Sequence, residues 1–300
     1  MMKSFQEIQE AAYQKGGGRI AVAGAEGAAV LEAVLNARSR GIMDPILVGD
    51  SEKIQQIAGD HRLDIGSIRV VNAADETIAA GKAVQLVHEG EADGLMKGKV
   101  STPMLLKTVL DKKYNLRSDR LLSHIALLEI SGYHKLLLVT DGGMVIRPDL
   151  NQKSAILSNG LDVLRKLGVS RPKAAVLAAI EKVNPDMPET QHAEALVEAA
   201  RKGRFGDAVV EGPLAVDVAL SRSAAEIKGI ESRISGNPDL FLMPDIACGN
   251  IFAKGLVYMA GAKIGGLIVG ARKPIILLSR ADDAETKFRS IALGSVVAAA

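Results

Sequence analysis

Basic and hydroxyl side chains gather in a short segment that follows an apolar run. The segment contains Lys97, Gly98, Lys99 and Thr102, and a helical pattern begins at its end. Ammonium groups, a glycine that admits close backbone approach and the start of a helix together favour an anionic ligand. The spacing differs from that of a P-loop. The segment therefore predicts a phosphate site of another kind, and a capped turn with solvated lysines is the alternative.

A second segment places a serine and an arginine directly after the apolar run 274–278. Ser279 and Arg280 are expected to emerge at the end of a strand. A guanidinium group can hold phosphate or carboxylate through two parallel hydrogen bonds, and a serine hydroxyl can stabilise negative charge that develops during a reaction. The alternative is that Asp282 or Asp283 caps the next helix and the arginine lies on the surface.

A third segment offers an amide and an ammonium group on one predicted helix. Asn250 is expected to cap a helix over 251–261, and Lys254 lies one turn further on. Both side chains can meet a polar ligand, and capping with a solvated lysine is the alternative. Cys248, the only cysteine in the sequence, is interpreted as a small buried residue. A single cysteine excludes an intrachain disulfide and a cysteine-cluster zinc site.

The histidines predict no metal site. None of them forms the H-x-x-x-H pair of metal-binding helices. Only His124, which precedes a strand-like run, is retained as a site candidate. Residues 24–27 follow a strand-like run but lack the G-x-G-x-x-G spacing, which disfavours a nicotinamide cofactor.

Short β-branched runs alternate with longer helical patterns along most of the chain. This alternation predicts an α/β fold with a mostly parallel sheet and helices on both of its faces. Ligands of such folds bind at the carboxyl ends of strands and between domains. The predicted strands are 19–23, 45–48, 68–71, 94–96, 173–177, 208–210, 240–243, 267–269 and 274–278, and the predicted helices are 28–40, 51–58, 75–89, 102–111, 152–167, 190–203, 251–261 and 283–299.

Two neighbouring apolar runs interrupt the alternation. They cover 125–130 and 135–139 and are separated only by a Ser-Gly-Tyr-His link. A parallel crossover needs a much longer connection, so the two runs predict a hairpin that forms an antiparallel edge.

Composition excludes several kinds of partner. The chain has 300 residues, which is enough for about two domains. Its net charge is only +2 and its aromatic content 3%, which argues against nucleic-acid binding by bulk charge or base stacking. No apolar run is long enough to span a membrane, and the N-terminal residues lack the apolar core of a signal peptide. We therefore expect a soluble, cytoplasmic protein without nucleic-acid or membrane partners.

Taken in order, these segments resemble the phosphate acetyl/butyryltransferase family over nearly the whole chain. The loops at 96–98 and 184–190 are more similar to the butyryl branch than to the acetyl branch. The resemblance implies a reversible reaction in which acyl-CoA and inorganic phosphate give acyl phosphate and free CoA. CoA is then a substrate, with no tightly bound cofactor and no metal. The matching motifs lie at 46–50, 96–102, 122–125, 139–141, 183–185, 212–217, 244–254 and 279–282.

The resemblance also implies an architecture. It predicts two three-layer αβα lobes with mostly parallel sheets flanking an active-site cleft, similar to isocitrate and isopropylmalate dehydrogenases. The first lobe would comprise residues 1–139 and 275–300, and the second residues 140–274. A homodimer or a larger homo-oligomer is expected.

Site residues follow from the same resemblance, position by position. Ser279 and Arg280 match a Ser-Arg pair that stabilises the tetrahedral intermediate and binds phosphate. Asn250 and Lys254 match an Asn and a Lys on a helix facing the cleft. The loop matching the phosphate and CoA site supplies Lys97, Gly98, Lys99 and Thr102, and Lys107 is expected within reach of a CoA phosphate.

The general base is a point of departure from the resemblance. The acetyl branch has an aspartate six residues after the arginine, and Thr286 holds that position here. We assign the role to Glu285, with Asp282 and Asp283 as alternatives. A further alternative is that no carboxylate acts, because a thiol with a reference pKa of about 8.5 ionises in a modestly electropositive site.

Other functions remain as alternatives. Phosphate acetyltransferase activity is the nearest, because the sequence does not fix the acyl chain length. A non-catalytic protein that binds CoA or acyl phosphate is supported only by the missing aspartate. A two-lobed decarboxylating dehydrogenase needs a metal-binding cluster and a hydride-transfer site, and the sequence suggests neither.

Overall fold

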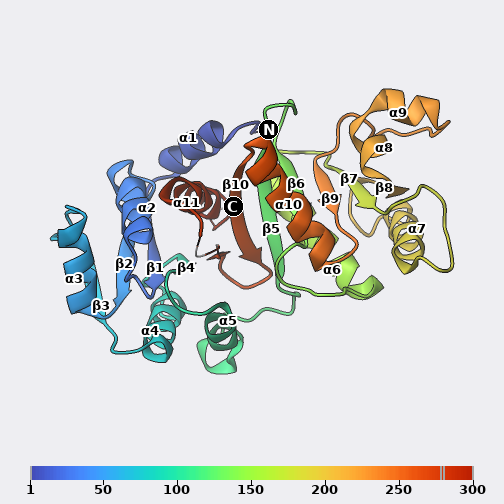
Figure 1. The fold of residues 1–300 in the computed structure, drawn as a ribbon. Helices are drawn as coiled ribbons and strands as arrows, with labels where there is room; N and C mark the ends of the chain where they lie inside the picture. Colours follow the sequence, from blue (N-terminus) through green and yellow to red (C-terminus); the bar gives the residue numbers. More distant parts are fainter. Residues whose placement is uncertain (1, 278, 280, 299–300) are drawn as a thin grey trace. The chain divides into compact units, whose positions relative to one another are not determined.

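Two compact units divide the chain, and each is assembled from two separate stretches of sequence. Unit 1 comprises Met1–Ser4 and Leu121–Ile264, and unit 2 comprises Phe5–Arg120 and Gly265–Ala300. The computed structural model in Figure 1 describes residues 2–277, 279 and 281–298. The lobe boundaries expected from the sequence, 139/140 and 274/275, remain a prediction.

Unit 2 is built on a mostly parallel sheet with the strand order β3-β2-β1-β4-β11-β10. Only the β10–β11 pair is antiparallel among the pairings described within this unit. The strands are β1 (Gly18–Ala23), β2 (Met43–Gly49), β3 (Arg69–Asn72), β4 (Gly94–Lys97), β10 (Lys263–Val269) and β11 (Ile275–Ile276). The helices are α1 (Phe5–Lys15), α2 (Ala28–Ser39), α3 (Ser51–Asp60), α4 (Glu76–His88), α5 (Thr102–Leu110), the 3-10 turn η1 (Lys112–Tyr114) and α11 (Ala284–Ala298).

Helices cover both faces of this sheet, which makes unit 2 a three-layer structure. α11 packs against α1 and α2 on one face, and α4 packs against α5 on the other (Figure 1). The four residues 20–23 of β1 are completely buried. Such a continuous apolar run is typical of a parallel strand that is covered on both faces.

Unit 1 has the strand order β5-β6-β9-β7-β8. Its strands are β5 (Ser123–Glu129), β6 (Leu137–Thr140), β7 (Lys173–Leu177), β8 (Val209–Leu214) and β9 (Leu240–Leu242). Its helices are α6 (Leu150–Lys166), α7 (Pro188–Arg201), α8 (Val216–Leu220), α9 (Arg222–Ile227) and α10 (Ile246–Ala260).

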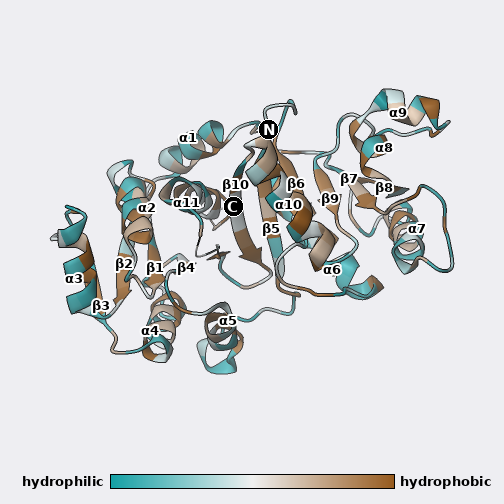
Figure 2. Cartoon of the chain, viewed as in Figure 1, coloured by the Kyte–Doolittle hydropathy of each residue, from teal (hydrophilic) through white to brown (hydrophobic). Residues whose placement is uncertain are grey.

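Alternate residues of β6 face different layers of unit 1. Val139 belongs to the core that includes Val218 of α8. Leu138 points to the other face, where a Cβ added to Gly160 of α6 would lie 3.4 Å from it. The period of two therefore fills both sides of the sheet, and Figure 2 shows the apolar colour concentrated in the strands. The predicted α/β fold with a mostly parallel sheet is confirmed.

The predicted hairpin is present, but its place at an edge is wrong for β6. β5 and β6 pair in antiparallel fashion, yet β6 also pairs in parallel with β9. All four residues of β6 are completely buried. Burial removes water as a partner for the backbone, so both edges of the strand need a neighbour.

Three helices were missed by the sequence patterns. α1 buries Phe5, Ile8 and Ala12, a helical spacing that was available in the sequence. α8 and α9 have 5 and 6 residues, too few to show a period. Among the described residues, no helix combines the length and apolar character needed to cross a membrane. The cytoplasmic location remains a prediction.

Candidate functional site

The loop after β4 is closed by its own first lysine. Lys97 is 5% exposed, and its ammonium group donates hydrogen bonds to the carbonyl oxygens of Gly98 and Val100 at 3.1 and 3.2 Å. Lys99 is exposed and Thr102 is half-buried. The alternative of a capped turn with solvated lysines therefore fits Lys99. It does not fit Lys97, whose side chain is buried at the end of the strand.

Gly98 is required by the packing of one loop on another. Its N–H donates to the carbonyl oxygen of Ala23 at 2.8 Å, and the N–H of Lys99 donates to that of Gly24 at 2.6 Å. A Cβ on Gly98 would lie 2.0 Å from the Gly24 carbonyl oxygen. In the structure, Gly98 thus allows the loop after β4 to approach the loop after β1 closely.

The N-terminus of α5 faces a carboxylate of the chain itself. The N–H of Ser101, the residue before the helix, donates to the carboxylate of Glu76 on α4. Because the positive end of a helix attracts anions, Glu76 competes there with any bound phosphate. Lys107 is exposed in the last turn of α5. It lies roughly 8 Å along the helix axis from Thr102, so the fold sets it apart from the loop.

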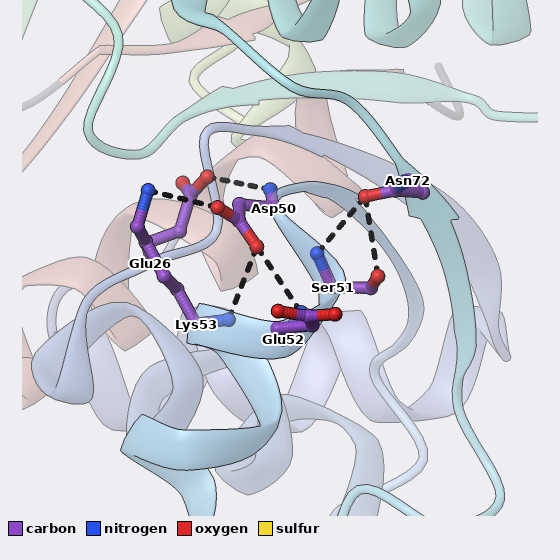
Figure 3. Close-up of polar contacts among 6 residues, drawn as sticks. All are labelled: Glu26, Asp50, Ser51, Glu52, Lys53 and Asn72. Carbon is purple, nitrogen blue, oxygen red and sulfur yellow. Dashed lines mark hydrogen bonds and ion pairs between the residues drawn. The ribbon is translucent and has the colours of Figure 1, made fainter.

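Polar side chains occupy the neighbouring strand ends (Figure 3). Glu26 accepts a hydrogen bond from the N–H of Asp50 at 2.7 Å. Asp50 forms an ion pair with Lys53 at 2.8 Å, and this hydrogen-bonded contact lowers the pKa of Asp50. The N–H and hydroxyl of Ser51 both donate to Asn72 at 3.1 Å. The ends of β1, β2 and β3 are thus filled by the chain's own groups.

Ser279 leaves the sheet next to the β4 loop, because β11 pairs in parallel with β4. Ser279 is exposed. Its N–H donates to the carboxylate of Asp282 at 2.8 Å, and its hydroxyl oxygen accepts from the N–H of Ala281 at 3.3 Å. Arg280, the expected phosphate ligand, lies outside the described residues.

The three acids considered as general base have different contacts. Asp282 holds the Ser279 N–H, and Asp283 accepts from the N–H of Thr286 at 2.7 Å. The hydrogen bond from Thr286 lowers the pKa of Asp283, which makes it a weaker base. Glu285 is exposed in the first turn of α11 and, within the described part of the chain, forms no hydrogen bond or ion pair. Glu285 is therefore the acid of this set that is open to a ligand.

A buried lysine beneath this turn was missed by sequence reasoning. Lys287 is 5% exposed, and it donates to the carbonyl oxygen of Asp282. Burial lowers the pKa of Lys287. Its helix, α11, is buried almost continuously from residue 286 to residue 297. A lysine within such an apolar helical pattern was the available signal, since its ammonium group must reach a polar edge.

In unit 1, Asp141 organises the loop after β6. Its buried carboxylate accepts hydrogen bonds from the N–H groups of Gly143 and Met144 at 2.7 and 2.8 Å. It also accepts from the N–H of His124 at 3.1 Å, which ties the loop to β5. His124 thus contributes its backbone to this loop.

Asn250 contacts the same loop instead of capping a helix. Its Nδ2 donates to the carbonyl oxygen of Gly142 at 3.2 Å. α10 begins at Ile246, and its N-cap is Asp245, which accepts from the N–H of Cys248 at 2.9 Å. The predicted start at 251 and the capping role of Asn250 are therefore wrong, because the Asp245 carboxylate caps the helix earlier.

Lys254 follows Asn250 by one turn, and both side chains are exposed on the same side of α10. Cys248 is also exposed, contrary to the expected burial. Gly249 and Ala253 are the buried residues of α10. Partial burial and the neighbouring Asp245 raise the pKa of the Cys248 thiol, which disfavours a thiolate nucleophile.

Unit 1 contains a buried lysine that sequence reasoning also missed. Lys153 on α6 is 3% exposed. Burial lowers its pKa, and the negative charges of Glu189 and Asp245 act in the opposite direction. His192 belongs to the same group, since burial and the charge of Lys153 lower its pKa. The available sign of this burial was the spacing in the sequence. Lys153 precedes the buried Ile156 by three residues, which places both on one face of the helix.

In both units, positively charged and hydrogen-bond-donating groups lie at the carboxyl ends of parallel strands. Among residues 2–277, 279 and 281–298, no three or more His, Cys, Asp or Glu side chains are grouped to hold a metal ion. Groups of this kind stabilise negative charge that develops on an acyl or phosphoryl centre. The fold keeps Ser279 and the β4 loop together in unit 2, and Asn250 and Lys254 together in unit 1.

Known proteins are similar to this chain in sequence and fold. The family model described as "Phosphate acetyl/butaryl transferase" matches residues 4–80 and 76–295. The chain is 42% identical over 298 residues to the phosphate butyryltransferase of Clostridium acetobutylicum, covering 99% of each protein. It is 38% identical over 294 residues to the phosphate acetyltransferase of Thermotoga maritima, covering 98% of this chain and 99% of that protein. A branched-chain phosphotransacylase from Enterococcus faecalis V583 matches with a TM-score of 0.81 and 33% identity, covering 93% of this chain and 98% of that one.

Proposed function

Since the chain belongs to the phosphate acetyl/butyryltransferase family and is an acyltransferase, we propose that it transfers a butyryl group reversibly between CoA and inorganic phosphate. The family expected from the sequence is confirmed. The observation that carries the butyryl assignment is the 42% identity, over 99% of both proteins, with a phosphate butyryltransferase. The phosphate butyryltransferase of Clostridium beijerinckii, 37% identical over 299 residues, supports the same choice.

The proposed chemistry needs no covalent intermediate on the protein. The thiolate of CoA attacks the carbonyl carbon of butyryl phosphate and forms a carbon–sulfur bond. The tetrahedral intermediate carries its negative charge on oxygen, and it collapses when the bond to the phosphate oxygen breaks. Holding both reactants in place replaces a bimolecular encounter with a step inside one complex.

The proposed roles follow the chemistry of each group. The Ser279 hydroxyl donates to the oxyanion, and Arg280 holds the phosphate through its guanidinium group. Glu285 accepts the proton of the CoA thiol, which its exposure and its lack of a described partner support. The proposed substrate-binding residues are Lys97, Gly98, Lys99, Thr102, Lys107, Asn250 and Lys254.

We also propose that the protein is a homodimer with α10 at the interface. Ile251, Tyr258 and Met259 are 72, 74 and 90% exposed. With Ala247 and Gly255 they form an uncharged face of this helix. A second copy can cover such a face about a twofold axis, with the exposed Lys254 at its border.

The reaction is tested by the release of free CoA with and without phosphate. Butyryl-, isobutyryl-, propionyl- and acetyl-CoA are compared at equal concentration. We expect phosphate-dependent release with the highest kcat/KM for butyryl-CoA. The highest value for acetyl-CoA would instead identify a phosphate acetyltransferase. CoA binding by calorimetry without release from any of the four would identify a non-catalytic binding protein.

A further inference from the structure

A basic pocket lies within unit 1, away from the loops that carry the candidate residues of that unit. Its volume is about 390 Å³, within the range of small-molecule sites. The charged and titratable groups that line it are Lys3, Lys135, Arg171, Lys173, His134 and a single carboxylate, Asp239.

The pocket is at the amino ends of the parallel strands. Lys173 is the first residue of β7, Asp239 immediately precedes β9, and Lys135 lies two residues before β6. These three strands are neighbours and parallel to one another. They have 4, 5 and 3 residues. About 10 to 17 Å of strand therefore separates the pocket from the loops that carry Asp141 and Asp245.

The single carboxylate of the pocket is already engaged. One oxygen of Asp239 pairs with the buried ammonium group of Lys135. The other accepts the backbone N–H of Lys173 at 2.7 Å. Lys135 also donates to the carbonyl oxygen of Asn237 at 3.0 Å. Asp239 therefore cannot balance the remaining cations as well.

Two cations of the pocket are uncompensated. Arg171 is exposed and Lys173 half-buried, and within the described part of the chain neither side chain forms an ion pair. Lys173 adds to the effect of burial in lowering the pKa of Lys135. An anion bound between Lys135 and Lys173 would offset the repulsion between the two ammonium groups.

We propose that this pocket binds a compact polyanion with two or more phosphate groups, such as pyrophosphate. Several cations around one cavity favour multiple negative charges in one ligand over a single orthophosphate. The lining contains no Phe, Tyr or Trp, so a nucleobase has little to stack on, and the phosphate groups themselves are recognised. This site is independent of the proposed acyl transfer.

The test is a calorimetric titration of the full chain with pyrophosphate in the presence of saturating CoA, which occupies the proposed substrate site. The pocket variant carries Arg171→Gln and Lys173→Gln. The control variant carries Arg201→Gln and Lys202→Gln, which remove the same charges from exposed positions on α7 and its C-terminal end. Thermal unfolding of each variant verifies that it is folded.

We expect each chain to bind one pyrophosphate. The affinity should be at least 30-fold weaker in the pocket variant, and within twofold of the wild-type affinity in the control variant. An unchanged affinity in the pocket variant, or an equal loss in both variants, would overturn the proposal. Absence of binding heat in the wild type would do the same. ADP is expected to bind no more tightly than pyrophosphate, and a tenfold tighter ADP complex would overturn recognition through phosphate alone.

Discussion

Single buried side chains show where this protein accepts an energetic cost. Lys97, Lys153 and Lys287 each bury an ammonium group almost completely. Removing a charge from water is unfavourable unless the new contacts compensate for it. Groups of this kind concentrate at functional sites, where a fixed charge is needed in place of a hydrated one.

Lys153→Met is expected to stabilise the fold. Burial lowers the pKa of Lys153 from its ordinary value of 10.5. Between the two pKa values the unfolded chain binds more protons, so wild-type stability rises with pH in that window. The advantage of the Lys153→Met variant should therefore shrink as the pH approaches 10.5.

Urea unfolding at pH 7, 9 and 10 measures this difference. Lys202→Met, at an exposed position, is the control and should show no such pH dependence. A Lys153→Met variant that is less stable than the wild type at pH 7 would contradict the prediction.

Ser279→Ala is expected to lower kcat by about 10² to 10³, the usual effect of removing one donor to an oxyanion. Ser221→Ala is a matched control, because the Ser221 hydroxyl also accepts a backbone N–H, from Ala224 at 3.2 Å. The Ser221→Ala variant should lose about 1 kcal/mol of stability, because a helix cap is removed, and its kcat should be unchanged. Steady-state assays and thermal unfolding separate the two effects, and a kcat within twofold of the wild type for Ser279→Ala would remove the hydroxyl from the mechanism.

The positions of candidate residues were predictable where a residue follows a strand-like run. The places of Ser279 after β11 and of Lys97 at the end of β4 agree with this prediction, whereas the burial of Lys97 was not predicted. Lys153 and Lys287 escaped because they lie inside helical patterns, where a lysine ordinarily faces water. Only the packing around a helix decides whether such a lysine is solvated or buried.

At the scale of elements, contacts between loops position the candidate groups. The loops after β1 and β4 meet through Gly24 and Gly98, with backbone atoms too close for a side chain. The loop after β6 and the start of α10 meet in the same way, since a Cβ on Gly249 would lie 2.7 Å from the Asp141 carbonyl oxygen. These contacts fix the basic loop and the Asn250 side chain within their own units.

Gly98→Ala is expected to destabilise the protein by more than about 3 kcal/mol, because backbone atoms must move to admit the methyl group. Gly59→Ala in α3 is the control. An added Cβ there meets no atom within 4 Å. Alanine's higher helix propensity should make that variant more stable by about 0.5 to 1 kcal/mol. Chemical denaturation measures both, and a Gly98→Ala protein as stable as the wild type would show that the two loops can separate freely.

The helices and strands were predicted well where the periodic pattern of apolar residues was long and uninterrupted. The helix predicted over 152–167 is observed as α6 over Leu150–Lys166. The start of α10 was misplaced because Asn250 and Asp245 are both good caps, and it is Asp245 whose carboxylate accepts an N–H of the first turn. The edge assignment of β6 failed because its partner, β9, lies about 100 residues later in the chain, and such pairing leaves no local signal.

At the scale of the whole molecule, α10 presents a surface that a monomer rarely exposes. Its uncharged outer face, Ala247, Ile251, Gly255, Tyr258 and Met259, is the basis of the proposed homodimer. Exposed apolar patches of this kind mark contact surfaces. The same helix carries Asn250 and Lys254 beside that face, so assembly and substrate binding would share one element.

Ile251→Glu and Met259→Glu together are expected to convert the dimer into a monomer, because an isologous interface doubles every added charge. Ile227→Glu, at an 83% exposed position on α9, is the control and should leave the dimer intact. Sedimentation velocity at several concentrations measures the mass. A wild-type monomer at all concentrations, or a dimeric double variant, would refute this interface.

The interleaving of the two units has a consequence for synthesis on the ribosome. β4 of unit 2 pairs with β11, which is translated about 180 residues later. All of unit 1, including the early residues 1–4, has emerged once residue 264 has left the ribosome. At about 5 to 20 residues per second, the free edge of β4 stays unpaired for on the order of ten seconds or longer. Unit 1 can therefore complete its fold before the sheet of unit 2 is closed, and the unpaired edge of β4 is open to wrong pairing in the meantime.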